Sequence, residues 1–228
     1  MARAVPTNPR KSATQERSRA TVQALLDATA RVLTKEGYDR ASTNRIAATA
    51  GVSVGSLYQY FPNKEALVAA LVARHNREML DLLRDALKEV ASLDLATAIA
   101  KLVRAAVDAH RVDPALHRVL DEQVPRMGQL AKIEALQGET FHLVRSYLEE
   151  RRSEISVRDL DSTTSILVTT VEALTHAFVI HKPDALDGDR DRFIDEVTRL
   201  IVGYLQPDRR RRRGPSTRRQ SVHPGKRR

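Results

Sequence analysis

Residues 42–65 read STNRIAATAGVSVGSLYQYFPNKE, and this stretch decides the fold. Ser42 or Thr43 can cap a first short helix, because a side-chain oxygen accepts a hydrogen bond from a backbone N–H group that lacks a helical partner. Gly51 can adopt the left-handed conformation that ends this helix. Ser53 can then cap a second helix over 54–60. Two helices joined by a short turn that contains glycine form a helix-turn-helix unit.

The second helix carries the residues that we expect to read bases. In a helix-turn-helix unit, the N-terminal part of this helix enters the major groove of DNA. Gln59 can make a bidentate contact to adenine, and the apolar Val54 can touch a thymine methyl group. Ser56 is the third candidate for base readout, and Gly55 would let the backbone approach the DNA closely.

Other side chains of the stretch are expected to bind phosphates, which set position rather than sequence. Tyr60 offers a hydroxyl group, and Lys64 offers a charge at the start of the next helix. The alternative is that the tyrosines are ordinary core residues. Leu57 and Phe61 already supply a buried face at helical spacing, so Tyr58 is left to point elsewhere, although Tyr60 could still be partly core. The expected DNA-binding residues, with Thr43 among the phosphate contacts, are Thr43, Ser53, Val54, Gly55, Ser56, Tyr58, Gln59, Tyr60 and Lys64.

This stretch resembles the DNA-binding domain of the TetR family of bacterial transcriptional regulators. The resemblance covers roughly residues 15–75, and Val54 and Gln59 lie at positions that vary within the family and serve operator choice. The rest of the chain resembles the family only in length and helical character. The positions that carry the resemblance are Ala28, Leu33, Gly37, Tyr38, Thr43, Ile46, Ala47, Ala50, Gly51, Val52, Ser53, Gly55, Leu57, Tyr58, Tyr60, Phe61, Lys64, Glu65 and Leu67.

The resemblance implies a ligand-controlled repressor. Two subunits would place their second helices in major grooves of a pseudo-palindromic operator. A small molecule would bind the C-terminal domain and shift the long helix that begins at Lys64. An activator, or a DNA binder of the same fold without a ligand, is the first alternative. An enzyme is disfavoured, because no paired carboxylates, Ser-His-Asp set or phosphate loop has a convincing context.

Composition sets further limits on the function. The 228 residues suffice for one or two domains with a proper core, and the chain has no cysteine for a disulfide, a zinc-thiolate site or thiol catalysis. No apolar run approaches the roughly 18 residues that cross a membrane, and the N-terminus lacks the apolar core of a signal peptide. We therefore expect a cytoplasmic protein with no membrane association and no cofactor.

The net charge of +9 is concentrated at the two ends of the chain. Residues 207–228 hold ten Lys or Arg and one Asp, whereas residues 1–20 hold five basic residues and one Glu. The remainder is mildly acidic. We expect a flexible arm at 1–14 and a disordered basic tail at 207–228, which either adds salt-sensitive DNA affinity or has no role.

Apolar side chains recur at helical spacing along the rest of the chain, and no strand alternation appears, so the predicted fold is all-α. An N-terminal helix-turn-helix domain over 15–75 is joined by a long helix to a helical ligand-binding and dimerisation domain over 76–206. The long helix has a predicted apolar stripe that includes Leu82. The helices expected outside the helix-turn-helix are 14–36, 64–90, 94–111, 114–124, 129–152, 163–180 and 189–205.

The helix over 163–180 is apolar on nearly all sides, with Glu172 as its only clearly charged group. Such a helix is buried on more than one side. We expect it to pack antiparallel to the helix over 189–205 and to form a four-helix bundle with the same pair of a second subunit. The alternative is that it forms the centre of the monomer core.

Histidines on the helices of the C-terminal domain give only hints of a ligand site. Histidines on apolar faces can bind a ligand, but they are more often satisfied core or surface residues. Their spacing matches no metal motif, so no metal is expected. The candidate ligand-binding residues are His110, His117, Met127, Phe141, His142 and His176.

Overall fold

The computed structural model describes residues 16–123, 130–181 and 189–206. Every regular element within those ranges is a helix, which confirms the all-α prediction. The expected arm at 1–14, the basic tail at 207–228 and the candidate ligand residue Met127 lie outside the described residues.

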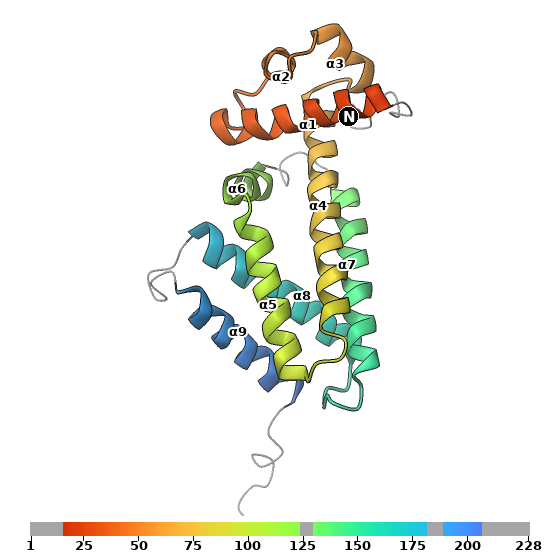
Figure 1. Cartoon of the computed structure of the whole chain (residues 1–228), viewed down its shortest axis with the longest axis vertical. Coiled ribbons are helices and arrows are strands. Elements are labelled where there is room, and N and C mark those ends of the chain that lie inside the picture. Colours follow the sequence, from red (N-terminus) through yellow and green to blue (C-terminus); the bar gives the residue numbers. More distant parts are fainter. Residues whose placement is uncertain (1–15, 124–129, 182–188, 207–228) are drawn as a thin grey trace, which may run out of the picture.

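The first three helices form a small domain at one end of the long axis of the molecule (Figure 1). They are α1 (Glu16–Glu36), α2 (Thr43–Ala50) and α3 (Val54–Tyr60). A fourth helix, α4 (Lys64–Glu89), leaves this domain and runs along the axis into the rest of the molecule. The boundaries of α2 and α3 are those that the capping residues predict.

Side-chain caps fix the ends of these short helices. Ser42 accepts a hydrogen bond from the Arg45 N–H at 3.3 Å, and Ser53 accepts one from the Ser56 N–H at 3.1 Å. Gly51 has a φ of 69°, the left-handed conformation that ends α2, as predicted. The cap oxygens satisfy N–H groups that the first turn of a helix leaves unpaired, so each short helix begins at a defined residue.

The core of the helix-turn-helix domain is apolar. Leu57 and Phe61 are both buried, as the sequence predicts. α1 packs against α2 and α4, and its Leu25 and Leu33 are among the fully buried side chains. Burial of one such side chain is worth about 1.5–3 kcal/mol, so a few of them hold α3 in place.

The long helix α4 belongs to both parts of the molecule. With 26 residues it is about 39 Å long at a rise of 1.5 Å per residue. Its first half buries Leu67 and Leu71, and its second half buries Leu80. The prediction that Leu82 belongs to the buried stripe is wrong, because this side chain is 49% exposed. Leu82 follows the buried Leu80 by two residues, or about 200° around the helix, so the two side chains face opposite sides.

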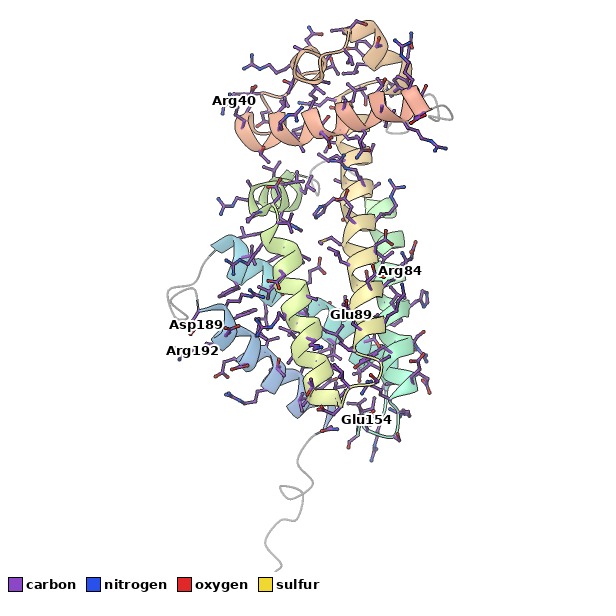
Figure 2. All side chains as sticks on the ribbon, in the orientation of Figure 1. Arg40, Arg84, Glu89, Glu154, Asp189 and Arg192 are labelled. Atoms are coloured by element: carbon purple, nitrogen blue, oxygen red, sulfur yellow. The ribbon has the colours of Figure 1, made fainter. Side chains whose placement is uncertain are left out.

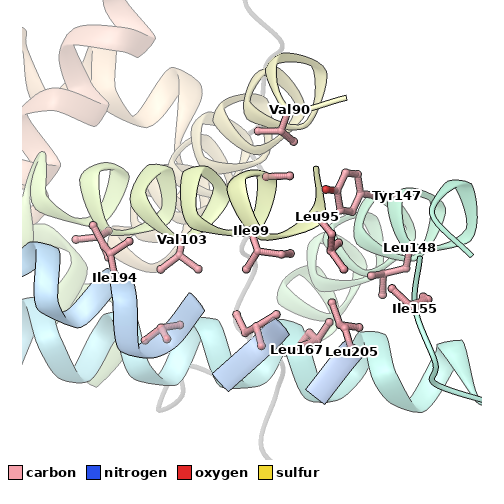
Figure 3. Packing of buried hydrophobic residues seen from close by; sticks show 14 of the residues in the cluster. Val90, Leu95, Ile99, Val103, Tyr147, Leu148, Ile155, Leu167, Ile194 and Leu205 are labelled. Carbon is pink, nitrogen blue, oxygen red and sulfur yellow. The ribbon is translucent and has the colours of Figure 1, made fainter. Parts of the chain in front are cut away.

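The C-terminal domain is a bundle around the lower part of α4. Its core brings together Val103 of α5, Leu148 of α7, Leu167 of α8 and Ile194 of α9 (Figure 3). Its helices are α5 (Leu95–Arg111), α6 (Pro114–Gln123), α7 (Leu130–Glu150), α8 (Leu160–His176), the π-helical η2 (Ala177–His181) and α9 (Arg190–Leu205).

The last two helices are not each other's main partners. α9 packs chiefly against α5, whereas α8 packs against α7 and α5. The prediction that these two helices pack mainly against each other, as an antiparallel pair within one chain, is therefore wrong. The apolar face of α5, with Ile99 and Val103 buried, offers both helices a surface to cover.

The helical segment Leu160–Ile180 is 21 residues long and, by length and composition, apolar enough to cross a membrane. The expectation that no run approaches this length is wrong for this segment. Its contacts with α5 and α7 place it in the helical bundle, and Leu167 and Phe178 are buried there. Ile166, on another side of the helix, is 49% exposed.

Two arginines tie α4 to α7. Arg84, visible beside α7 in Figure 2, donates to Glu139 at 3.0 Å. Arg151 is buried at the far end of α4 and donates to the carbonyl groups of Val90, Ala91 and Leu93 at 2.8–3.0 Å. These carbonyls lie at and just after the end of α4, where the Val90 carbonyl also accepts from the Leu93 N–H at 3.1 Å, so Arg151 caps that end of the helix.

Candidate nucleic-acid interface and histidine cluster

The outward face of α3 is the candidate DNA-binding surface. Ser53, Gly55, Tyr58 and Gln59 are exposed, whereas Leu57 of the same helix is buried. Val54 and Ser56, two of the predicted base contacts, are partly buried. The helix therefore presents polar groups and a glycine outward while one fully buried leucine holds it to the domain.

A hydrogen bond on this face joins the two short helices. The hydroxyl groups of Thr43 and Tyr58 lie 3.1 Å apart, and either can donate. Thr43 is the first residue of α2, and Tyr58 lies in α3. The two predicted DNA-binding hydroxyls therefore form one preformed pair rather than two independent contacts.

Tyr60 has a different position from the other predicted DNA-binding residues. Its side chain is only 8% exposed, and its hydroxyl donates to Ser18 Oγ of α1 at 3.2 Å. The ring therefore belongs to the core of the domain, as the alternative reading of the tyrosines allows. The hydroxyl connects α3 to the beginning of α1.

Lys64 also makes contacts within the domain. Its Nζ donates to the Tyr38 carbonyl at 2.9 Å and lies 4.0 Å from the centre of the Tyr38 ring. The Tyr38 hydroxyl donates to Glu65 at 3.0 Å, and burial together with this carboxylate raises the pKa of Tyr38 to about 12. These contacts fix the start of α4 against the loop that follows α1. A phosphate bound by Lys64 would have to share its ammonium group with a backbone carbonyl.

The C-terminal domain brings together four histidines, one from each of four helices. We call His75 of α4, His110 of α5, His117 of α6 and His176 of α8 the histidine cluster. The ring of His117 lies 4.3 Å from that of His75 and 4.5 Å from that of His110, and His110 lies 4.9 Å from His176. Each of the last three contributes one ring nitrogen to a group whose members all lie within 4.8 Å of one another.

Three imidazole rings of this cluster, those of His75, His110 and His117, have lowered pKa values that favour the neutral form. Burial lowers the pKa of His117 to about 3 and that of His110 to about 4, and the neighbouring histidines lower both further. Burial also lowers the pKa of His75. Because Nδ1 of His110 lies 2.8 Å from the Ala106 carbonyl, which can only accept, the proton of this ring is on Nδ1. Its Nε2 therefore keeps a free lone pair.

The structure separates the predicted ligand-binding residues into two groups. His110, His117 and His176 belong to the histidine cluster, whereas His142 is exposed on α7 beside Phe141. Sequence reasoning missed His75. No local signal could have found it, because each member of the cluster lies on a different helix and tertiary packing alone brings them together.

Comparison with known proteins identifies the family. Residues 25–71 match the domain model described as bacterial regulatory proteins of the tetR family. Residues 94–205 match the tetracyclin repressor-like C-terminal domain. The chain belongs to the TetR family of bacterial transcriptional regulators. Regulators of the TetR family bind DNA and function as dimers.

Sequence similarity to individual TetR-family regulators covers only part of each chain. The fatty acid metabolism regulator protein of Bacillus subtilis is 31% identical over 68 residues, which are 30% of this chain and 35% of that protein. The transcriptional repressor KstR of Rhodococcus jostii is 42% identical over 50 residues, or 22% of this chain and 24% of that protein. The chain thus aligns with about a third or less of each of these relatives, which are regulators rather than enzymes.

Solved structures share the whole fold. The fatty acid degradation regulator FadR from Bacillus halodurans superposes with a TM-score of 0.65 at 22% identity, over 81% of this chain and 96% of that one. A TetR-family transcriptional regulator from Streptomyces coelicolor superposes with a TM-score of 0.57 at 24% identity, over 81% and 97% of the two chains. These likenesses extend the shared architecture from the DNA-binding domain to the C-terminal domain.

Proposed function

We propose that this TetR-family protein is a cytoplasmic, homodimeric transcriptional repressor that a small ligand releases from a pseudo-palindromic operator. The observation that carries the proposal is the outward face of α3, where Ser53, Tyr58 and Gln59 are exposed on a helix that Leu57 anchors in the core. Such a helix can enter a major groove without rearrangement of its own domain. The repressor name of the relative from Rhodococcus jostii supports repression over activation.

The proposed base contacts come from few side chains. Gln59 is the best donor and acceptor for a base edge, and Val54 and Ser56 lie near the N-terminus of α3. The Thr43–Tyr58 hydroxyl pair is proposed to bind phosphate, and Gly55 keeps the surface beside it low. With so few groups for readout, much of the specificity must come from the geometry of two half-sites.

The proposed dimer interface uses the exposed apolar side chains of the last two helices. Ile166 of α8 is 49% exposed, Leu200 of α9 is 55% exposed, and Tyr204 of α9 is 38% exposed. A second copy that covers the helices around 163–180 and 189–205 would remove these side chains from water. A two-fold axis there would present two α3 helices to half-sites about one helical turn of DNA, roughly 34–36 Å, apart.

Ligand release is proposed to work through the contacts between the two domains. α4 continues from the DNA-binding domain into the C-terminal bundle, and α6 packs beneath α1 (Figure 1). Leu116 and Leu120 of α6 lie in the same apolar core as α1 and α3. A ligand need only bind better to the arrangement in which the spacing of the two α3 helices does not match the operator.

Selection of DNA fragments from a random pool by the purified full-length protein tests this proposal. We expect an enriched inverted repeat, and we expect Gln59→Ala to change the preferred bases within each half. Gln23→Ala, a matched change on the exposed side of α1, should leave the selected sequence unchanged. If no inverted repeat is enriched, the proposal that the protein binds a pseudo-palindromic operator is wrong.

A further inference from the structure

The histidine cluster has the donor chemistry of a transition-metal site. Three ring nitrogens, one each from His110, His117 and His176, lie within 4.8 Å of one another. Imidazole ligands suit zinc, copper, iron and nickel, whereas magnesium and calcium take oxygen ligands. Three protein ligands with an open fourth position are a common arrangement for zinc. We propose that these three histidines bind one divalent transition-metal ion of the zinc class.

The geometry of the side chains allows such a site to close. With zinc–nitrogen bonds of about 2.0–2.1 Å, tetrahedral ligand nitrogens lie about 3.4 Å apart. The three nitrogens must therefore approach one another by at most about 1.4 Å, which rotation of the side chains together with a small shift of α6 can supply. The ring of His117 lies 4.5 Å from that of His110 in a stacked arrangement, so a small tilt of either ring moves the nitrogens.

The hydrogen bond that orients His110 also suits a metal ligand. The Ala106 carbonyl holds the proton of His110 on Nδ1 and leaves Nε2 as the ligand atom. A ligating histidine commonly donates its other ring N–H to a carbonyl in this way, which fixes the ring orientation.

His75 is assigned as a positioning residue. Its ring packs edge-on against that of His117, with 4.3 Å between the ring centres, and it lies outside the group of three ligand nitrogens. It comes from α4, so the cluster connects this helix with the helices that supply the ligands. This contact would orient His117 and would couple the position of α4 to the geometry of the metal site.

A metal at this site would link the helices on which the proposed release depends. His117 lies on α6, which packs beneath α1, and His75 lies on α4, which enters the DNA-binding domain. A metal ion that draws His117 toward His110 and His176 would move α6 relative to α5 and α8. This regulatory step rests on the proposed function, whereas metal binding itself does not.

Metal binding can be measured on full-length protein without DNA. Protein stripped by a chelator is titrated with Zn²⁺ in competition with a chromophoric chelator, and with Co²⁺, whose visible absorption reports nitrogen coordination. We expect one ion per chain. His110→Gln and His176→Gln should each weaken Zn²⁺ binding at least about tenfold. His142→Gln, a matched change at an exposed histidine, should leave the affinity unchanged.

Two further measurements keep the test decisive. His117→Gln replaces a buried ring, so the thermal unfolding curve of this variant is recorded. If it does not fold, the test rests on His110→Gln and His176→Gln, which change half-buried side chains. His75→Phe keeps a ring beside His117, so it should retain one Co²⁺ per chain with a weakened affinity or altered absorption. No bound ion, or equal affinities in the ligand variants and His142→Gln, would overturn the metal site.

DNA binding separates this inference from the proposed function. Stripped protein and protein with one equivalent of Zn²⁺ are both tested on the selected operator. Zn²⁺ binding without any operator binding would reject the proposed function and leave the metal site intact. Operator binding by a protein that takes up no Zn²⁺ or Co²⁺ would reject the metal site and leave the proposed function intact.

Discussion

The two domains of this protein fill their interiors differently. Among the described residues, the helix-turn-helix domain buries one polar side chain, Thr29, whose hydroxyl donates to the Leu25 carbonyl at 2.7 Å. The buried polar or charged side chains of the C-terminal domain are His117, Arg151, Thr163, Thr164 and Thr175. Buried polar groups cost free energy unless each finds a partner, so a domain that needs only to hold its shape has little use for them.

This difference matches the tasks of the two domains. An apolar interior with capped short helices holds α3 in one orientation, as a DNA-reading surface requires. The C-terminal domain places imidazoles and a guanidinium where several helices meet, and such groups can respond to a ligand. The contrast teaches that the domain proposed to bind the ligand differs from the DNA-binding domain in the polar groups of its core rather than in its apolar pattern.

The largest expected effect tests the apolar interior of the helix-turn-helix domain. Phe61 is 1% exposed and ends α3, so Phe61→Ala should lower the free energy of unfolding by about 3–5 kcal/mol. Denaturant unfolding followed by circular dichroism measures this change. Leu82→Ala, at a side chain that is 49% exposed, is the control and should change little. A loss below about 1 kcal/mol for Phe61→Ala would show that the domain repacks easily, which would contradict the view that its apolar interior holds α3 in one orientation.

The next prediction asks whether the C-terminal domain supplies the dimer. Leu200→Glu puts a charge in the proposed interface, and we expect a monomer whose operator affinity falls about a hundredfold, or about 2.8 kcal/mol. Sedimentation and operator titration measure the two effects. Val112→Glu, at a side chain that is 83% exposed and distant in sequence from the last two helices, should leave both unchanged. A dimer that survives Leu200→Glu would place the interface elsewhere.

A smaller effect tests the buried polar groups of the C-terminal domain. Arg151→Ala removes the guanidinium that donates to the carbonyls of Val90, Ala91 and Leu93, and it should destabilise the protein by about 1–3 kcal/mol. Thermal or denaturant unfolding gives the value. Lys88→Ala removes an exposed ion pair near the same end of α4 and should change stability by less than about 1 kcal/mol. Equal effects of the two changes would mean that Arg151 adds nothing beyond a surface charge.

The smallest effects concern the glycines of the helix-turn-helix. Gly51→Ala should destabilise by about 1–2 kcal/mol, because φ is 69° there, although a Cβ would meet nothing within 4 Å. Gly55→Ala lies in helical backbone with only an ordinary contact at 3.8 Å, so it should keep or raise stability while it weakens operator binding. Unfolding curves and operator titrations separate the two roles. Normal operator affinity in Gly55→Ala would show that the backbone at this position does not approach DNA closely.

Much of the fold could be predicted from the sequence because its signals are local. Ser42, Gly51 and Ser53 set the bounds of α2 and α3 through caps and one left-handed residue, and each acts within four residues of its partner. The exposed and buried sides of α3 also follow from helical spacing. The placement of Tyr60 could be foreseen only in part, since its hydroxyl reaches Ser18 across 42 positions of the chain.

The sequence by itself determined the helices, the helix-turn-helix and the polar face of α3, because caps, turns and apolar periodicity act between near neighbours. Tertiary structure alone decided that α9 packs on α5, that Arg151 completes the end of α4, and that four distant histidines meet. The physical reason is that burial brings side chains together by the packing of helices, and no spacing along the chain encodes which of them will face one another.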